Sequence, residues 1–537
     1  MIYLAGDNDL SPEMIRSLQG MKDAANSKQV NILVGLDSIS LGTKFIKLNG
    51  DTSVATGFPS SSVKHDELPL ETNELNSSES VKELLRIATT DYPADNYMLI
   101  VFGHGPIIRG AFLQDSHPVS AVTLTEFSAI LAGYFGPDKG RKLGVLGLHN
   151  CIISGVELVY QLRDTVEYIL GSQGLVLRVG WPYQRLLNAI TSPLENGATE
   201  LATPLQVAGR MLRVCAKHNY DYYEYMDRSF EQALCSAPKS LEIVAALRGN
   251  AEKPGLATLL LQNLNLLKET GGEAQELGRL VREAINLARL EAQSFWQSQF
   301  VDLADFCSLL ADKCRFFISL AGNKGNFGDE LDKIADACDT VKQAIENTVM
   351  GDYYIGPERQ YATGLSIYFP WAVPNEMITV KGPEGPLRRQ AFADYCSYIF
   401  AQDAQWGDFL VAFLASTLRA ARQSDGSTKL FPDATQFTES VNTVGKSNQE
   451  VGKSNQEVGK SNQEVDKSNQ EVDKSNQEVG KSNQEVGKSN QEVGKSNQEV
   501  GDESCSCMTN NFPNQWQPGI VLQQLLNESD QSFFNRY

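Results

Sequence analysis

Continuous apolar runs alternate with amphipathic stretches over the first 200 residues of the chain. Five runs are apolar at nearly every position, as expected of strands buried on both faces of a parallel sheet: 2–5, 30–36, 97–102, 143–148 and 168–170. Stretches with helical spacing, such as 81–87 and 124–134, lie between them. This alternation predicts an α/β domain over residues 1–200, with an open, mostly parallel sheet flanked by helices.

Beyond residue 200 the apolar spacing becomes mostly helical, as in the stretches 257–267, 277–290 and 331–345. One further strand is expected near 364–369, where Pro370 ends an apolar run. We therefore assign residues 201–425 to a mostly helical C-terminal region of the same protein, with this one returning strand.

Eight tandem copies of the unit Val-(Gly/Asp)-Lys-Ser-Asn-Gln-Glu occupy residues 444–499. A coiled-coil seam needs two apolar positions per heptad, whereas this unit has one. Six of the copies also contain glycine, which costs about 1 kcal/mol at each position of a helix. We predict a low-complexity linker over residues 426–503, followed by a short tail at 504–537.

Composition narrows the classes of function. Hydrophobic residues make up 42% and charged residues 21%, which is typical of a globular protein. The chain has 47 Lys and Arg against 66 Asp and Glu, a formal net charge of −19, so no nucleic-acid partner is expected. No apolar run reaches the roughly 18 residues that a membrane span requires.

The N-terminal sequence and the cysteines bear on the compartment. No basic segment precedes an apolar stretch near Met1, so we expect a cytoplasmic protein. If an upstream segment is missing from this sequence, secretion is expected instead. The nine cysteines are odd in number and scattered, which indicates reduced thiols and neither a disulfide framework nor a metal site.

Two candidate catalytic residues follow apolar strands. His104 comes after the run 97–102, between Gly103 and Gly105, and Cys151 comes after the run 143–148. The carboxyl ends of parallel strands meet at one edge of a sheet, where ligands and substrates usually bind. Helical spacing begins immediately after Cys151, which predicts a thiol pKa lowered by a helix dipole. The pair suggests a cysteine nucleophile with its base; the alternative is a buried small residue and an ordinary turn histidine.

The chain resembles the clostripain-like cysteine peptidases, whose catalytic domain has a caspase-type fold. Similar segments follow one another in the family's order: 2–10, 102–105, 151–162, 171–173, 180–183, 301–306 and 363–370. The resemblance implies an endopeptidase with a Cys151–His104 dyad and an acyl-enzyme intermediate, acting on a protein or peptide substrate. It also implies an oxyanion held by the backbone N–H groups of Gly105 and Cys151.

Substrate preference is where this sequence departs from the family. Family members usually have aspartate two residues before the nucleophile, where it helps to receive Arg or Lys at P1; here that position is His149. An imidazole cannot replace a fixed negative charge for this purpose. The family's preference for Arg or Lys at P1 is therefore in question for this chain. His149 is also an alternative base, although His104 matches the family's motif. The resemblance predicts a pocket formed by His149, Ser172, Gln173, Trp181 and Tyr183. For Trp181 and Tyr183 the equal alternative is packing in the core.

Two further expectations come from the family, and one alternative function remains. Family members are often activated by cleavage between the strand before the histidine and the strand before the cysteine. The basic loop with Lys139, Arg141 and Lys142 lies there and is the candidate cleavage site; the alternative is an exposed charged turn. Calcium would bind through Asp7 and Asp9, unless these form a solvated turn; no other cofactor or metal is expected. The substituted His149 and the heptad linker suit an alternative, a catalytically inactive caspase-fold binding or scaffold protein. The oligomeric state is not indicated.

Overall fold

The structure is a computed structural model of the chain. It describes residues 1–22, 30–39, 41–48, 65–67, 75–110, 112–117, 119–177, 180–195, 203–226, 228–269, 271–295, 299–321, 327–371, 377–382 and 385–417. The predicted linker at 426–503, with its heptads, and the predicted tail at 504–537 lie outside the described residues. Their assignment, like the predicted boundaries of the other regions, stays a prediction.

A nine-stranded sheet forms the centre of the described structure, in the order β13-β10-β9-β8-β5-β1-β2-β3-β4. The five middle strands pair in parallel: β9 (Val166–Gly171), β8 (Leu143–His149), β5 (Met98–Phe102), β1 (Ile2–Gly6) and β2 (Leu33–Ser38). These are the five apolar runs that the sequence identifies as strands. The predicted open, mostly parallel sheet is therefore confirmed.

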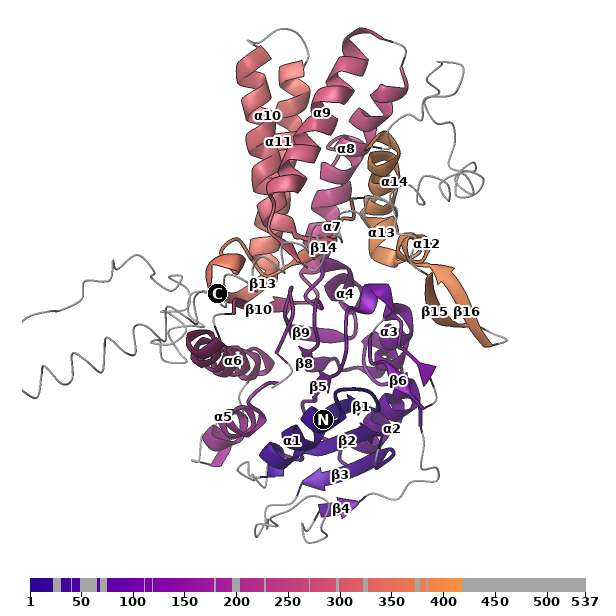
Figure 1. Cartoon of the computed structure of the whole chain (residues 1–537), viewed down its shortest axis with the longest axis vertical. Helices are drawn as coiled ribbons and strands as arrows, with labels where there is room; N and C mark the ends of the chain where they lie inside the picture. Colours follow the sequence, from indigo (N-terminus) through magenta and orange to yellow (C-terminus); the bar gives the residue numbers. More distant parts are fainter. Residues whose placement is uncertain are drawn as a thin grey trace, which may run out of the picture. The chain divides into compact units, whose positions relative to one another are not determined.

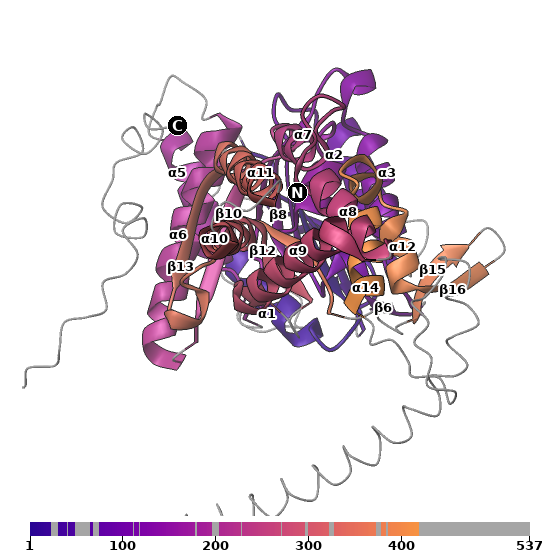
Figure 2. The ribbon, with the colours of Figure 1, turned by 90° about the horizontal axis from the view of Figure 1, so that it is seen from above.

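Helices cover both faces of this sheet (Figures 1 and 2). One face carries α1 (Ser11–Lys22), α5 (Tyr183–Glu195) and α6 (Pro204–Met226), and the other carries α2 (Ser77–Thr90), α3 (Leu124–Ala132), α4 (Val156–Gln161) and α7 (Ser240–Arg248). Alternate residues of one strand enter two separate cores: in β1, Ile2 and Leu4 enter one, and Tyr3 and Ala5 the other. The strands are apolar throughout because both of their faces are buried.

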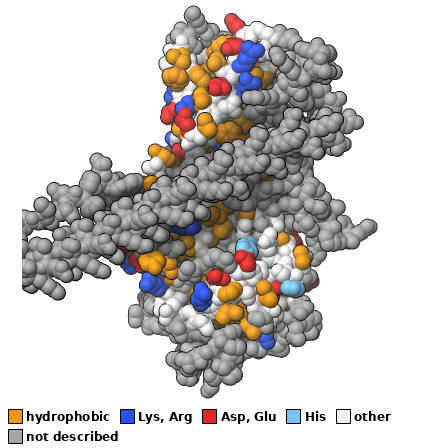
Figure 3. Space-filling model, viewed as in Figure 1, with side chains coloured by type: hydrophobic (Ala, Val, Ile, Leu, Met, Phe, Trp, Pro, Cys, Tyr) orange, Lys and Arg blue, Asp and Glu red, His pale blue; other side chains and the backbone are white. Residues whose placement is uncertain are grey.

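The predicted helical region is also present. Its long helices extend side by side beyond the sheet (Figure 1) and include α8 (Leu256–Asn265), α9 (Gly272–Glu291), α10 (Leu303–Ala321), α11 (Phe327–Thr348) and α14 (Trp406–Thr417). On the visible surface of these helices, hydrophobic side chains lie among acidic and basic ones (Figure 3). Two shorter helices, α12 (Ala391–Cys396) and α13 (Ile399–Asp403), precede α14. Among the described helices, none is long and apolar enough to cross a membrane.

The prediction of a single returning strand in this region is wrong. β14 (Ser366–Tyr368) forms there, in a small sheet with β11 (Ser294–Phe295) and β12 (Phe300–Asp302). However, β10 (Phe230–Ser236) and β13 (Val349–Ile355) also come from this region and extend the main sheet in antiparallel pairing. Their sequences lack a continuous apolar run because β10 buries Glu231 and Gln232, and β13 contains Gly351 and Asp352.

The remaining strands are short and lie at the periphery. They are β3 (Lys44–Leu48), β4 (His65–Glu67), β6 (Asp115–Ser116), β7 (Val119–Ser120), β15 (Met377–Gly382) and β16 (Gly385–Gln390). Of these, only β3 and β4 join the main sheet among the described strands. The middle of the sheet, with its carboxyl edge, is therefore set by the five parallel strands.

Candidate active site

The two candidate catalytic residues lie at the carboxyl edge of neighbouring strands. β5 and β8 pair in parallel, with Phe102 opposite His149. Two residues beyond this pair, the chain reaches His104 on one side and Cys151 on the other. The structure thus brings these two residues to the same edge of the sheet, as the sequence predicts.

The backbones that follow these two strands are in direct contact. The Asn150 side-chain amide donates a hydrogen bond to the His104 carbonyl oxygen at 3.0 Å. A Cβ atom on Gly105 would collide with the Cys151 carbonyl oxygen, so only glycine fits there. Among the described residues, none accepts a hydrogen bond from the backbone N–H of Gly105 or of Cys151. Both N–H groups can therefore donate to an incoming oxygen.

The Cys151 thiol is held by the peptide groups of Val176. The Val176 N–H donates to Sγ at 3.4 Å, and Sγ lies 3.9 Å from the Val176 carbonyl oxygen. Burial raises the pKa of the Cys151 thiol above its usual value, the Val176 N–H opposes this shift, and Glu231 adds to it. The surroundings of Cys151 therefore favour the thiol over the thiolate.

The predicted helix dipole at Cys151 is wrong. The helix α4 begins only at Val156, and Ile152 has a φ of 52°. The N–H groups of Ile152 and Ile153 donate to the carbonyl oxygens of Gly174 and Ser172 at 2.8 Å. Because these donors pair with the loop after β9, the N-terminus of α4 does not begin at the thiol.

The histidine is bound by Asp9, which the sequence suggested only as a calcium ligand. His104 Nε2 lies 2.6 Å from Asp9 Oδ1, and Asp9 follows β1, the strand on the other side of β5. The His104 side chain is 30% exposed and that of Asp9 is 63% exposed. An acid, an imidazole and a thiol therefore lie at the ends of three adjacent strands, β1, β5 and β8.

His149 is a neutral member of an aromatic stack. Its ring lies 3.9 Å from that of Phe102 and 5.2 Å from that of Trp181, nearly parallel to both. Its Nδ1 lies 3.2 Å from the Tyr183 hydroxyl. Burial, with a smaller contribution from His218, lowers the pKa of His149 to about 3. A buried imidazole of this kind is unsuited to act as the base, which argues against the alternative that His149 takes this role.

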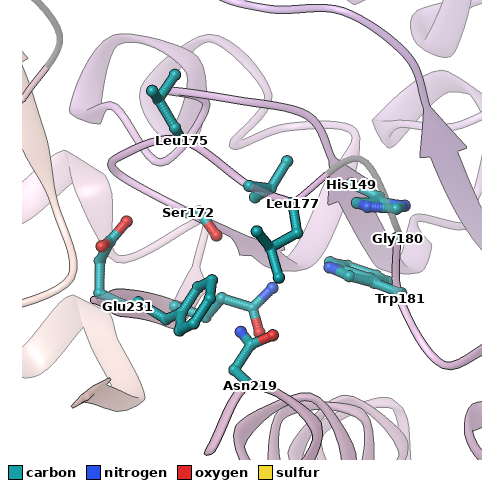
Figure 4. A pocket seen from close by; sticks show the side chains of 11 residues that line it. His149, Ser172, Leu175, Leu177, Gly180, Trp181, Asn219 and Glu231 are labelled. Carbon is teal, nitrogen blue, oxygen red and sulfur yellow. The ribbon is translucent and has the colours of Figure 1, made fainter. Parts of the chain in front are cut away.

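A small pocket with room for about one water molecule is lined in part by Val176, the residue whose peptide groups contact the Cys151 sulfur. Figure 4 shows His149 and Trp181 with their rings face to face on one side and Glu231 on the opposite side. Three predicted pocket residues line it, together with residues that the sequence did not indicate: His149, Ser172 and Trp181, then Leu175, Val176, Leu177, Gly180, Asn219, Phe230, Glu231 and Gln232.

The other two predicted pocket residues do not line it. The Gln173 side chain is buried, donates to Asp302 Oδ2 at 2.9 Å and accepts from the Gly364 N–H at 3.0 Å. It therefore fixes the loop after β9 to the strand region around Asp302. The Tyr183 hydroxyl contacts His149 Nδ1, and Tyr183 is not among the residues that line the pocket. The Gln173 amide and the Tyr183 hydroxyl therefore both have hydrogen-bond partners within the protein and are not part of the pocket wall.

An acidic residue that the sequence analysis missed is in the pocket. Glu231 Oε1 accepts a hydrogen bond from the Gly174 N–H at 2.6 Å, and Oε2 lies 2.8 Å from Arg359 Nε. Burial raises the pKa of Glu231 to about 7, and Arg359 and the Gly174 N–H oppose this shift. Glu231 lies on β10, which has no recognisable strand pattern, so its position could not be read from the sequence.

The predicted processing loop lies at the opposite edge of the sheet. Lys139 ends a short 3₁₀ helix, Pro137–Lys139, and Arg141 forms a bridge to Gly136. Lys142 Nζ donates to the Arg163 carbonyl oxygen at 2.8 Å. This loop precedes β8 whereas Cys151 follows it, so the seven residues of β8 separate the two by about 20 Å.

The two aspartates considered for calcium are engaged by histidines. Asp7 accepts from the His117 N–H at 2.7 Å and lies 3.1 Å from its Nδ1, whereas Asp9 binds His104. Within the described ranges, no group of three or more His, Cys, Asp or Glu side chains is arranged to hold a metal ion. Calcium binding through Asp7 and Asp9 stays a prediction.

His104 and Cys151, at adjacent carboxyl ends of the parallel sheet, lie in a segment that matches a known family. The family model described as the Clostripain family, peptidase C11, matches residues 2–244. The predicted resemblance to the clostripain-like cysteine peptidases is therefore confirmed for this segment, which is a little less than half of the chain. It contains His104, Cys151 and Glu231. A comparison with curated proteins found no significant match.

Solved structures of C11 proteases are also similar to this chain. A secreted C11 cysteine protease from Bacteroides thetaiotaomicron, in complex with an irreversible peptide inhibitor, is 15% identical, with 75% of this chain and 98% of that chain covered and a TM-score of 0.48. An inactive zymogen C11 protease from Parabacteroides distasonis is 17% identical, with 75% and 96% covered and a TM-score of 0.47. The family assignment rests on the family match.

Proposed function

We propose that the protein is a cysteine endopeptidase in which Cys151 is the nucleophile and His104 its base. One observation carries the proposal: both residues follow adjacent parallel strands of the family-matched segment, and their backbones touch through Gly105. The runner-up, a buried cysteine beside an ordinary turn histidine, leaves the steric need for glycine at this position unexplained.

The proposed reaction follows from these positions. His104 takes the proton from Cys151 Sγ, and the sulfur attacks the peptide carbonyl carbon. The resulting oxyanion accepts hydrogen bonds from the Gly105 and Cys151 N–H groups. When the C–N bond breaks, His104 returns the proton to the leaving amine. A water molecule, deprotonated by the same imidazole, then hydrolyses the thioester and restores the thiol.

Two properties of the Cys151 thiol in this structure oppose its attack on the substrate carbonyl: its raised pKa and its contacts with Val176. Because its pKa is raised, Cys151 gives up its proton only as the attack begins. The Val176 peptide also contacts Sγ on both its N–H and carbonyl sides. We infer that a substrate carbonyl reaches the sulfur only when this peptide moves away.

Single substitutions test the dyad. We expect Cys151→Ala and His104→Ala to abolish hydrolysis of a fluorogenic peptide library. Cys396→Ala is the matched control, since Cys396 is also a partly exposed free cysteine, and it should retain wild-type turnover. Full activity in either dyad variant would contradict the proposal.

We further infer that the pocket prefers a neutral P1 side chain. His149 carries no charge, and the Glu231 carboxylate is already paired with Arg359. A P1 arginine or lysine would therefore meet no free negative charge, and it would have to displace an existing ion pair. A panel of substrates that differ only at P1 tests this preference, and a strong preference for Arg or Lys in the wild type would refute it.

The alternative function, an inactive binding or scaffold protein, has one observation in its favour. The thiol is covered by Val176 and its pKa is raised, as expected of an unreactive cysteine. The rate of Cys151 alkylation by iodoacetamide at neutral pH separates the two functions. Fast alkylation of Cys151 compared with Cys396 supports the peptidase. Equal, slow alkylation together with no turnover in folded protein supports the alternative.

A further inference from the structure

We infer that Asp9 is a positioning residue that fixes the imidazole of His104 for the proposed reaction. This inference rests on the proposed function and adds a third member to its dyad. The observation behind it is the 2.6 Å distance between His104 Nε2 and Asp9 Oδ1. The strand order β8-β5-β1 puts this acid on the side of His104 away from Cys151.

The turn that carries Asp9 is built to hold its place. The preceding Asn8 donates from its side-chain amide to the Ala5 carbonyl oxygen at 2.9 Å and to the Gln114 carbonyl oxygen at 2.7 Å. Its side-chain oxygen accepts from the Leu10 N–H at 2.9 Å. Asn8 is buried, although the carboxylate beside it reaches the surface. The Asn8 side chain therefore fixes the turn through three hydrogen bonds, and Asp9 contacts His104 from this fixed turn at the end of β1.

A second anchor holds the same turn. The Asp7 carboxylate accepts from the His117 N–H at 2.7 Å, and the Asp7 carbonyl oxygen accepts from the Ser116 N–H at 2.9 Å. Asp7 and Asn8, the two residues before Asp9, are thus both tied to the segment 114–117. These contacts fix the position of the turn independently of the His104 contact.

The contact assigns roles to the two ring nitrogens. A neutral imidazole has one N–H donor and one acceptor nitrogen. Because Asp9 accepts at Nε2, the proton stays on Nε2, and Nδ1 has the lone pair that takes the proton from Cys151 Sγ. Nε2–H continues to donate to Asp9, which remains ionised and stabilises the positive charge formed on the ring.

The exposure of the pair argues for positioning over stability. An exposed ion pair contributes about 0–1 kcal/mol to folding, and the Asp9 side chain is 63% exposed. Loss of Asp9 should therefore leave the protein folded, but it frees the imidazole to rotate and to exchange tautomers. A small misplacement of a reacting group is enough to cost about 100-fold in rate.

Three substitutions at Asp9 test the inference. We expect Asp9→Ala to lower kcat by about 10-fold to 100-fold with KM nearly unchanged. Asp9→Asn keeps a side-chain oxygen that can accept from Nε2–H, so it should retain more activity than alanine; Asp9→Glu should restore part of it. Asp138→Ala is the matched control, an exposed aspartate at the opposite edge of the sheet, and its kcat should equal that of the wild type.

A second measurement does not depend on turnover. In ¹⁵N-labelled protein at mildly alkaline pH, the His104 signals, assigned by their loss in His104→Ala, should show Nε2 protonated. In Asp9→Ala the same signals should shift toward a mixture of tautomers. Unchanged signals would overturn the inference, whatever the activity of the wild type. An unchanged kcat in Asp9→Ala, or a fall in kcat matched by a lower melting temperature, would also overturn it. Absence of turnover in the wild type would instead count against the dyad itself.

Discussion

Arg359→Ala should make the enzyme prefer a basic P1 residue. In the folded protein the Arg359 guanidinium forms an ion pair with the Glu231 carboxylate, with Nε 2.8 Å from Oε2. It also lies beside Gly174, where a Cβ atom would be 3.2 Å from its Nη2. Truncation to alanine removes the cation and opens space next to the carboxylate. The guanidinium or ammonium of a P1 side chain can then occupy the vacated position.

The size of the effect follows from the charge of the pair. A hydrogen bond to a charged group contributes about 1.5–3 kcal/mol, and about 1.4 kcal/mol is a factor of ten. We therefore expect the ratio of kcat/KM for P1 arginine to that for P1 leucine to rise by about 10-fold to 100-fold. Arg359 holds down the pKa of Glu231, which burial raises to about 7. In the variant this pKa rises further, so the new preference should strengthen as the pH is raised.

The assay compares a P1 arginine and a P1 leucine substrate at several pH values. Glu231→Gln with Arg359→Ala is the decisive double variant, since it keeps an oxygen for the Gly174 N–H but has no charge. It should show no gain. Arg315→Ala, which breaks a 2.6 Å ion pair with Asp339 in the helical region, is the matched control. An unchanged ratio in folded Arg359→Ala, or the same gain in the double variant, would refute the reasoning.

Further predictions concern pH, sterics and processing. The pKa of His149 is about 3 in the folded protein and 6.5 in the unfolded chain. As the pH falls below 6.5, the unfolded chain takes up a proton that the folded protein does not, so the free energy of unfolding falls. Urea unfolding at about pH 5 should show a loss of about 2 kcal/mol relative to pH 7, and His149→Gln should reduce this loss. Gly105→Ala should abolish turnover in folded protein, since its Cβ would collide with the Cys151 carbonyl oxygen; retained activity would contradict this. Cleavage at 139–142 should depend on protein concentration, since the loop cannot reach Cys151 in its own chain; a concentration-independent rate would argue otherwise.

The parallel strands could be predicted because burial on both faces leaves a mark in the sequence. β5 and β8 are continuous apolar runs, and the polar residues that follow them stand out. His104 and Cys151 could therefore be found from the sequence. β10 could not, because its buried Glu231 and Gln232 interrupt the apolar run. A strand that carries pocket residues lacks the pattern by which strands are recognised.

Contacts set by the order of strands could not be predicted either. Asp9 and His104 are 95 residues apart, and their contact exists because β1 lies beside β5. Sequence spacing also misplaced the start of α4. Ile152 and Ile153 fit a helical pattern, but their N–H groups are taken by the loop after β9. Which donors are free is decided by tertiary pairing, so the reactivity of the thiol was the least predictable property of the site.

The ion pair in the pocket joins two segments that lie far apart in the sequence. Glu231 lies within the family-matched segment, residues 2–244, whereas Arg359 lies more than a hundred residues beyond its end, just after β13. Selectivity can therefore diverge through changes in the later part while the cysteine and histidine stay untouched. A protein cut after residue 244 would also expose the free edge of β10, which invites aggregation. The part of the chain after residue 244 thus supplies Arg359 to the pocket and β13 to the edge of the main sheet.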